Sequence, residues 1–415
     1  MKRGKKSGFI LVSVYLIIIV LIILTIGFSS RSIQEANLSL RQKSSLQALY
    51  LAEAGVDSAL EWLRGYTAPP VPYNSGVVSL GAGNFNFTVT SIGALSYEVL
   101  CVGTVGGVTR ALSTTFTQDH YARYAYFTNS ELYQGGSVWF VDWDVLRGPV
   151  HTNSRFNMKG NPTFEDYVKS VSDVIRFYNN GSPIDTSSSS NPPYDAPDFQ
   201  YGLVLGADDV PMPARALDLR NAAASSGLYL NGSSTVTFNS NGTINVTNAA
   251  RGWNNFNTNI PANGAIFVNG AASVSGTVNG SATIGSSSNI TVTDNILYSD
   301  DPRTNPNSTD KLGIIAEAHV IIPQTAPNNL EIDASIMALN TSFTLQNFSQ
   351  GPPKGTLTVY GGIIQKNRGP VGTFSGMTKL SGYSKNYQYD TRLLTSPPPF
   401  NPTTGDYVML TWKEE

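Results

Sequence analysis

The chain has 415 residues, of which only 13% are charged, and its formal net charge is −2 at pH 7. This charged share is about half of that in ordinary soluble domains, and Gly, Ser, Thr and Asn supply much of the polar surface instead. A mildly acidic chain without a basic block makes a nucleic-acid partner unexpected. Cys101 is the only cysteine, which excludes an intrachain disulfide and a cysteine-based metal site. The length predicts two or three domains.

The N-terminus combines a basic start with a long apolar run. Four basic residues lie among the first six residues, and residues 9–28 are almost all apolar. About 20 apolar residues cross a bilayer as a helix, and the basic residues hold the N-terminus on the cytoplasmic side. A secretory signal peptide, which would have a shorter apolar core, and a plain signal anchor are the alternatives. We expect one membrane-spanning segment, with the rest of the chain exported.

Residues 9–64 contain no proline, so one continuous helix can form. At about 1.5 Å per residue it would be roughly 80–85 Å long, more than twice the bilayer thickness, so its C-terminal half must leave the lipid. Gly65, followed by two prolines, ends it. One face of that half carries an apolar stripe, Leu49, Ala52, Val56, Leu60 and Leu63. A second face carries acidic residues that we expect to face solvent or Arg64, namely Glu53, Asp57 and Glu61.

The leader and the helix resemble those of type IV pilins. Gly8–Phe9 after a basic leader (residues 1–8) resembles the class III signal of that family, and the resemblance implies that a prepilin peptidase cuts after Gly8 and methylates Phe9. Residues 48–55, Ala-Leu-Tyr-Leu-Ala-Glu-Ala-Gly, resemble the N-terminal region of PilX-like minor pilins of type IV pilus assembly. Ser13 stands where major pilins carry Glu. This departure argues against an abundant shaft subunit more than against membership of the type IV pilin family.

Residues 65–118 alternate between apolar and polar side chains, as half-buried strands do. Phe85 and Val89 belong to one such series, and Gly106–Gly107 is a hairpin signal between two others. We expect a small antiparallel β-meander here. Packed on the apolar stripe of the helix, it would complete a pilin-like α+β unit. Cys101 lies in one of the strands, where we expect a small core residue.

Residues 119–225 are predicted to connect this meander to a second β region and to contain its first solenoid rungs. Aromatic residues crowd positions 121–143, and positions 148–164 have the Asn and Gly corners of one rung. The apolar spacing predicts a short helix over 166–178 and a second one over 211–224. The composition of 179–197 predicts a loop.

His151, with Asp142 and Asp144 upstream, is a candidate for metal binding or acid–base chemistry. We favour a structural role, in which residues 151–153 lie at a corner and hydrogen-bond the backbone. The two other histidines of the chain have no metal-ligand spacing. The sequence therefore predicts no metal site.

Residues 226–365 carry short β-branched triplets between Gly and Asn, spaced by roughly ten residues, a pattern that favours a parallel β-helix or a sandwich. The lack of a fixed hairpin pairing and the Asn-rich corners favour the β-helix. Stacked apolar residues would then fill its lumen. Residues 366–415 are expected to form a C-terminal tail.

The stretch 120–400 also resembles an uncharacterised bacterial β-rich domain that often follows this pilin-like N-terminus. The resemblance implies no chemistry. It is carried by residues 151–153, 360–365 (Tyr-Gly-Gly-Ile-Ile-Gln), 368–372 (Arg-Gly-Pro-Val-Gly) and 389–393 before 397–400.

An enzyme is the alternative to weigh, because parallel β-helices often host polysaccharide lyases and hydrolases. Glycoside hydrolysis needs two carboxylates at one groove, and within 226–365 only Glu331 and Asp333 are spaced to share a strand face. Asp300–Asp301 precede a proline, as in a turn, with at most an incidental Ca²⁺ site. No nucleophile–base order or phosphate-binding glycine loop is present. We therefore expect no enzymatic activity, no cofactor, and no catalytic, cofactor-binding or metal-binding residue.

The sequence thus predicts an α+β, mainly β protein: a long pilin-like helix on a small antiparallel meander, followed by a β-solenoid head. The expected function is structural, that of a minor pilin or pseudopilin that primes, caps or decorates a type IV pilus or a related secretion filament. Expected partners are other pilin subunits, prepilin peptidase and the bacterial inner membrane, with the head exported. The alternative is a membrane-anchored surface adhesin whose solenoid binds polysaccharide or another surface.

Overall fold

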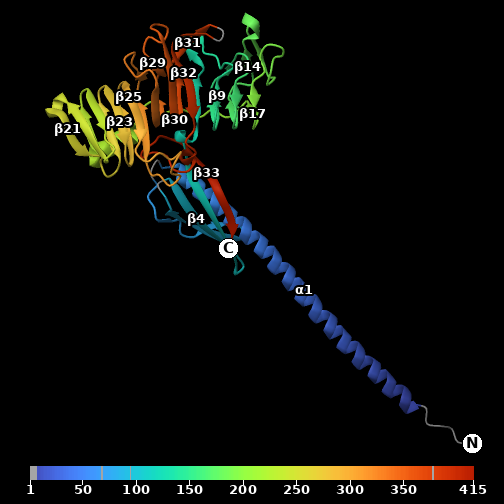
Figure 1. Ribbon diagram of the computed structural model, residues 1–415. Helices are drawn as coiled ribbons and strands as arrows, with labels where there is room; N and C mark the ends of the chain where they lie inside the picture. Colours follow the sequence, from blue (N-terminus) through green and yellow to red (C-terminus); the bar gives the residue numbers. More distant parts are fainter. Residues whose placement is uncertain (1–6, 67–68, 94, 376–377) are drawn as a thin grey trace, which may run out of the picture. The chain divides into compact units, whose positions relative to one another are not determined.

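The computed structural model shows a long N-terminal helix followed by a mainly β region (Figure 1). The chain divides into two compact units: unit 1 contains Met1–Gln118 and Gly405–Glu415, and unit 2 contains Asp119–Thr404. Residues 1–6, most of the expected leader, lie outside the described residues. The structure describes four stretches of the chain, 7–66, 69–93, 95–375 and 378–415.

Helix α1 is continuous from Ser7 to Arg64. It contains no proline that would interrupt its hydrogen bonds, and its 58 residues give a length of about 87 Å. The chain leaves the helix at Gly65, whose N–H donates to the carbonyl of Trp62 at 3.1 Å. The C-terminal boundary is therefore the one that the glycine and the following prolines predict.

The buried face of α1 is confined to its C-terminal third. Of the expected stripe, Ala52, Val56 and Leu63 are buried, whereas Leu49 and Leu60 are half-buried at its margin. On the opposite face Asp57 is exposed. The apolar residues at the centre of the buried face are Ala48, Leu51, Ala52, Val56, Ala59 and Leu63.

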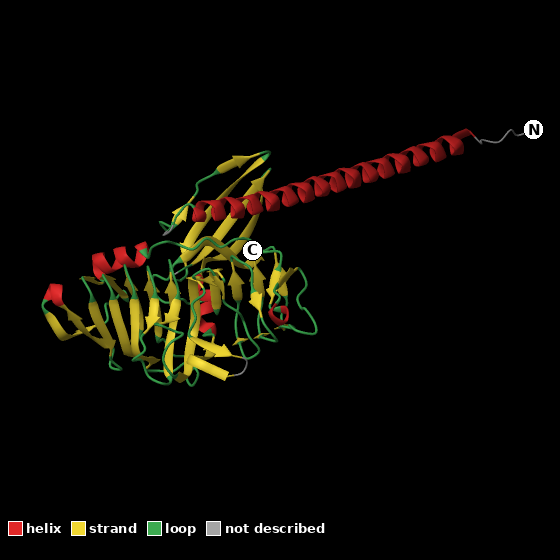
Figure 2. Ribbon diagram, turned by 90° about the horizontal axis from the view of Figure 1, so that it is seen from above, coloured by secondary structure: helices red, strands yellow, loops and turns green. Residues whose placement is uncertain are grey.

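This face of α1 packs on the antiparallel sheet of unit 1, which includes the expected meander (Figure 2). Side chains alternate along β4, so that Val99 and Cys101 are buried while Leu100 between them is exposed. Gly106 and Gly107, both with positive φ, form the two-residue turn from β4 to β5. The sheet order is β1-β3-β4-β5-β33, with β2 paired to β3; the strands are β1 (Tyr73–Asn74), β2 (Val78–Leu80), β3 (Gly83–Ser91), β4 (Ser96–Val105), β5 (Val108–His120) and β33 (Thr403–Glu414).

A glycine allows α1 to approach this sheet closely. A Cβ atom added to Gly103 of β4 would lie 2.1 Å from the carbonyl oxygen of Ala48 and 2.7 Å from the backbone nitrogen of Ala52. Both atoms belong to helix backbone, which cannot rotate away as a side chain can. Only glycine therefore fits at this crossing.

The C-terminal segment is not a tail, which corrects the expectation for residues 366–415. Its last strand, β33, adds to the edge of the unit 1 sheet, where Tyr407 is buried and its hydroxyl donates to the carbonyl of Leu63. Arg64 pairs with Asp406 at 3.2 Å. The sheet edge thus takes its last strand from about 290 residues further along the chain, a pairing that local patterns cannot reveal.

Unit 2 is built around a long ladder of parallel strands (Figures 1 and 2). In its register, Ile284 of one strand pairs with Ile314 of the next, and Ile314 pairs with Ile336 of the strand after that. All three isoleucines are fully buried, so like residues stack on one another from strand to strand. In ladder order the strands are β18 (Leu228–Asn231), β22 (Ala265–Asn269), β24 (Ser281–Ser286), β26 (Lys311–Ala316), β28 (Leu330–Ala338), β30 (Pro353–Asn367), β6 (Tyr126–Ser130), β10 (Val150–Thr152), β13 (Val168–Ser170) and β17 (Leu203–Leu205).

The ladder does not follow the chain order. Strand β6 pairs in parallel with β30, with Tyr126 opposite Ile363. The segment 126–205 therefore continues the stack beyond β30 instead of preceding β18. The expectation that residues 119–225 contain the first rungs is therefore wrong in its order, because the strands of this segment lie beyond β30 in the ladder. The sequence carries no signal for the pairing of β6 with β30.

Further short parallel ladders and a few antiparallel strands complete unit 2. The second parallel ladder joins β19 (Ser234–Phe238), β23 (Ala272–Val278), β25 (Ile290–Tyr298), β27 (Val320–Ile322) and β29 (Phe343–Leu345). The remaining strands are β7 (Leu132–Tyr133), β8 (Gly136–Ser137), β9 (Val145–Leu146), β11 (Asn157–Met158), β12 (Thr163–Phe164), β14 (Ile175–Phe177), β15 (Ile184–Thr186), β16 (Asp198–Phe199), β20 (Thr243–Asn248), β21 (Trp253–Asn259), β31 (Gly372–Ser375) and β32 (Thr378–Gln388).

The expected helix over 166–178 is absent, and β13 and β14 lie there. Val168 and Ile175 are both fully buried. Val168 pairs with Val150 and Leu203, and Ile175 pairs with Thr186, and this strand pairing overrides a helical spacing of apolar residues. The expected loop 179–197 contains the short strand β15. The second expected helix exists as α2, Leu217–Ser226, displaced toward the C-terminus from the range 211–224 that contains two prolines.

Candidate functional site

The first candidate site is the apolar surface of α1. Between Leu11 and Phe28 the large apolar side chains are 46% to 72% exposed, and none of the most apolar window of the helix is buried. At about 25 cal/mol per Å² of apolar surface, such a helix is strongly driven out of water. This exposed apolar surface is compatible with insertion into lipid or with packing against other apolar helices.

Gly8 and Phe9, the expected processing residues, lie in the first turns of α1 as the structure describes the backbone. Their side chains and the preceding residues 1–6 are outside the described part. Cleavage after Gly8 thus stays a prediction from the sequence.

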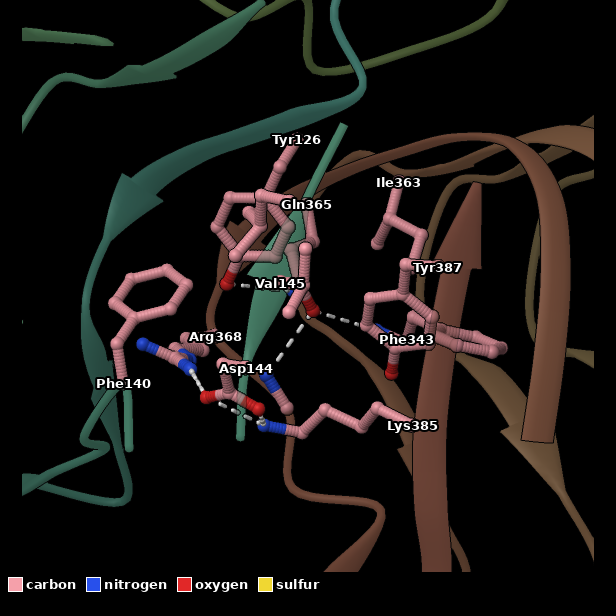
Figure 3. A pocket seen from close by; sticks show the side chains of 12 residues that line it. Tyr126, Phe140, Asp144, Val145, Phe343, Ile363, Gln365, Arg368, Lys385 and Tyr387 are labelled. Atoms are coloured by element: carbon pink, nitrogen blue, oxygen red, sulfur yellow. Dashed lines mark hydrogen bonds and ion pairs between the residues drawn. The ribbon is translucent and has the colours of Figure 1, made fainter. Parts of the chain in front are cut away.

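The second candidate site lies inside unit 2 and is centred on a cluster of buried charges (Figure 3). Arg368, which follows β30, pairs with Glu131 at 3.0 Å and lies 3.8 Å from Asp144. Lys385 of β32 pairs with the same Asp144 at 3.0 Å. Figure 3 shows Arg368 and Lys385 both pointing toward the Asp144 carboxylate. Two carboxylates and two cations therefore balance one another in the interior of the unit.

Arg368 also holds the loop of residues 138–144 in place. Its guanidinium lies 3.6 Å from the centre of the Phe140 ring and donates to the carbonyl oxygens of Val138 and Trp139 at 3.4 and 3.2 Å. Asp144 in turn accepts the backbone N–H of Val141 at 3.0 Å. The buried side chains of Arg368 and Asp144 thus fix the loop that carries Trp139 through its backbone.

Burial shapes the electrostatics of this cluster. It raises the pKa of the Glu131 carboxyl, and the nearby Arg368 opposes the shift. It lowers the pKa of the Lys385 ammonium, and Asp144 opposes that shift. Burial also disfavours the charged form of Arg368, but Tyr126, Glu131 and Asp144 outweigh it and raise its pKa. Each charge is stable because its partners are present.

Gln365 of β30 anchors the segment that leads into Arg368. Its side-chain oxygen accepts the N–H groups of Phe343 and Gly369, each at 3.0 Å, and its nitrogen lies 3.4 Å from the Tyr126 hydroxyl. Figure 3 shows it beside Tyr126. The glutamine thereby satisfies one buried and one partly buried backbone donor.

A groove of about 500 Å³ opens next to the charge cluster and shares Arg368 and Lys385 with it. Its lining is rich in half-buried aromatic rings, and we call it the aromatic groove. Trp143 lies 5.5 Å from Phe374, and Tyr133 lies 5.5 Å from Phe348, measured between ring centres. The aromatic lining residues are Tyr133, Trp139, Trp143, Phe348 and Phe374.

The expected structural role of residues 151–153 is met in part: Asn153 hydrogen-bonds the backbone of Val210, but His151 is not at a corner. It lies within β10 rather than at a corner, is 2% exposed, and stacks on the Phe127 ring at 5.2 Å. Its Nε2 atom contacts the side-chain oxygen of Asn153 at 2.8 Å, and the Asn153 amide donates to the carbonyl of Val210. In the described part of the chain no group of three or more His, Cys, Asp or Glu residues could hold a metal ion.

Asp142 and Asp144, the two acids expected beside His151, lie in different surroundings. Asp144 belongs to the charge cluster, whereas the Asp142 carboxylate accepts the N–H of Asn161 at 2.9 Å and lines the aromatic groove. Cys101 is fully buried in β4, as expected, and burial raises the pKa of its thiol to about 12. It is therefore not a reactive thiol.

Glu331 and Asp333 lie on β28 and share one cation. Arg303 contacts Glu331 at 2.7 Å and Asp333 at 3.4 Å, and it also pairs with Asp301. Asp333 is 1% exposed and accepts the N–H of Tyr298 at 3.1 Å. Burial raises the pKa of Asp333 to about 7, against the opposing effects of that N–H and of Arg303. This arrangement braces the loop around Asp301 against β28.

Fold and sites together define a mainly β protein with a long, exposed, apolar N-terminal helix. Residues 84–172 match a domain of unknown function (DUF4900). No curated protein matches the chain. Among solved structures, the competence-associated pilin ComZ from Thermus thermophilus is similar at 12% sequence identity, with a TM-score of 0.34, over 90% of this chain and 97% of that chain. A TM-score of this size is too low to assign a fold or a function.

Sequence reasoning missed the charge cluster and the aromatic groove. Two signals were present: the crowding of aromatic residues in 121–143, and the Arg-Gly-Pro motif at 368–370 in a chain with few charges. Neither signal shows that the two segments meet, because more than 200 residues separate them and they come together through strand pairing such as that of β6 with β30.

Proposed function

We propose that the chain is a minor pilin or pseudopilin, a structural subunit of a type IV pilus or of a related secretion filament. The observation that carries the proposal is the division of α1 into two parts. Its N-terminal part exposes apolar side chains throughout, whereas its C-terminal third is buried on the unit 1 sheet. A single rigid helix can thus be held in lipid at one end and by its own folded unit at the other.

The same geometry gives a mechanism for assembly. Before assembly, residues 9–28 lie in the inner membrane and unit 2 is exported. On assembly the helix leaves lipid for a bundle formed with the helices of other subunits, so its apolar surface stays out of water throughout. Ser13 in place of the glutamate of major pilins supports a priming, tip or decorating role.

Processing by prepilin peptidase tests this proposal. If Gly8–Phe9 is the cleavage site, N-terminal sequencing of the protein isolated from cells should begin at Phe9, with a methylated amino group. A mature chain that begins at Met1 would support the plain anchor instead. One that begins near Ser29 would support a secretory signal peptide.

The parallel ladders support an interpretation of unit 2 as a β-solenoid head. Each rung adds a strand to the ladder, and the stacked apolar residues fill the interior. The second candidate function, an anchored surface adhesin, uses the same head. The aromatic groove favours it as an additional role, because such a lining is suited to a ligand rather than to the core of the unit.

We also propose that the head is not an enzyme. The only acid pair considered from the sequence, Glu331 and Asp333, is engaged by Arg303. A double variant with Glu331→Gln and Asp333→Asn should assemble as the wild type does. Cleavage of polysaccharide by the wild-type protein that is lost in the double variant would overturn this proposal.

A further inference from the structure

The aromatic groove combines flat apolar surfaces with unused hydrogen-bonding groups. Trp139 and Trp143 are half-exposed, and within the described residues neither indole N–H donates to a protein atom. A buried indole normally finds an acceptor. These two indoles therefore present both a ring face and a donor to whatever enters the groove.

The lining of the groove is preorganised, because contacts within the protein hold it in place. Arg368 holds the loop of Trp139 from beneath, through the carbonyl oxygens of Val138 and Trp139. Trp139 also contacts the ring of Tyr178 edge-on at 5.4 Å, and Lys159 lies 4.5 Å over that same ring. A rigid, preorganised lining of this kind spares a ligand the entropic cost of ordering the loop.

The charges of the groove determine what kind of ligand fits. Arg368 and Lys385 are matched by the buried carboxylates of Glu131 and Asp144. Of the remaining ionisable lining residues, Lys159 is a cation and Asp142 is an anion. The net charge of the groove and its floor is therefore zero, which selects neither a polyanion nor a polycation.

We propose that the aromatic groove binds a segment of a neutral polysaccharide, with hexopyranose rings stacked on Trp143 and Phe374. One face of such a ring presents C–H groups, which pack on aromatic rings, and its edge presents hydroxyl groups. Hydroxyl groups both donate and accept hydrogen bonds, so they match the acceptor-only carboxylate of Asp142 and the donor-only ammonium of Lys159. A proline-rich peptide also packs on aromatic grooves, but its proline residues offer carbonyl acceptors and no donor to the Asp142 carboxylate beyond the N–H of Asn161 that it already accepts.

This binding site goes beyond the assembly role of α1, because every lining residue belongs to unit 2. The test uses the purified full chain in mild detergent and is independent of filament formation. The immobilised neutral probes are hydroxyethylcellulose, dextran and laminarin. The comparison probes are polygalacturonate, which is anionic, and a polyproline peptide.

We expect binding to at least one neutral probe, with little change between about 0.05 M and about 0.5 M NaCl because no ion pair is formed. Trp143→Ala and Phe374→Ala should each weaken binding about tenfold, and Trp143→Tyr should retain most of it because it keeps a ring. The matched control is Trp253→Ala, which removes a tryptophan of unit 2 that stacks on Phe256 outside the groove. It should bind as the wild type does.

Three results would overturn the proposal. The first is no binding to any neutral probe, and the second is equal loss of binding in Trp253→Ala and Trp143→Ala. The third is a preference for the polyproline peptide, or for polygalacturonate with a steep salt dependence. Thermal unfolding of each variant distinguishes loss of the binding site from loss of the fold. Trp143→Tyr is a second control, because it keeps an aromatic side chain at the same place.

Discussion

At the scale of single residues, Arg368 is the side chain on which most of the unit 2 site depends. Its side chain is 4% exposed, and the carboxylates of Glu131 and Asp144 beside it are 1% and 3% exposed. Replacing Arg368 by Met would leave the buried carboxylate of Glu131 without its cation, whereas Asp144 would keep Lys385. We expect a loss of about 3–5 kcal/mol in the free energy of unfolding, measured by chemical denaturation of the full chain.

The matched control is Arg147→Met. Arg147 pairs with Glu165, but the two side chains are 50% and 34% exposed, so the pair is screened by solvent. Its loss should change the unfolding free energy by less than about 1 kcal/mol. Similar effects of the two variants would mean that the buried cluster is not the electrostatic centre of the unit.

Asp333 gives a prediction about pH. Its pKa of about 7 in the folded protein lies above the ordinary value of an aspartate. The folded state therefore binds a proton more tightly than the unfolded state. The resulting stabilisation is complete below about pH 4 and is lost as the pH rises to about 7. Relative to Asp333→Asn, the wild type should become more stable as the pH is lowered from 8 to 5, by about 1 kcal/mol or more in the unfolding free energy.

The comparison variant for this effect is Glu331→Gln. Glu331 contacts the same arginine, but 35% of its side chain is exposed. This variant should keep most of the pH dependence of the wild type, because the Asp333 carboxyl is still present and buried, although loss of the Glu331 charge removes one of the smaller causes that raise its pKa. If Asp333→Asn kept it as well, the carboxyl of Asp333 would not be the titrating group.

At the scale of elements, the contact between α1 and the unit 1 sheet is tested by two adjacent positions. Val56 is 4% exposed and Asp57 is exposed on the opposite face. Val56→Asp would place an unpaired charge in the contact and should cost several kcal/mol of unfolding free energy. Asp57→Ala should be nearly silent. Equal effects in thermal unfolding would show that the helix is not docked through this face.

Gly103 tests the distance between the same two elements. Gly103→Ala would push a methyl group against the backbone of Ala48 and Ala52. We expect a destabilisation of about 1–3 kcal/mol, the usual cost of overpacking. Thr104→Ala, at the next position on the other face of β4, is the control and should cost less. If Gly103→Ala were neutral in chemical denaturation, the helix would lie further from the sheet than described.

Local patterns predicted the elements of unit 1 well and those of unit 2 less well. The end of α1 at Gly65, the alternation of β4 and the Gly106–Gly107 turn all depend on neighbouring residues, and all three were predictable. The strand β33, the strand β13 in place of a helix and the pairing of β6 with β30 depend on partners far away in the sequence. The aromatic groove was missed for the same reason.

At the scale of the whole molecule, we propose that the chain is stored in a membrane through α1 and then enters a filament. The most direct test compares sheared filaments with the inner-membrane fraction, in cells that produce the wild type or the variant Gly8→Leu. We predict that the wild type is found in sheared filaments and begins at Phe9, whereas Gly8→Leu stays in the membrane with its leader attached. A wild-type chain that remains entirely in the membrane fraction and still carries its leader would contradict the account.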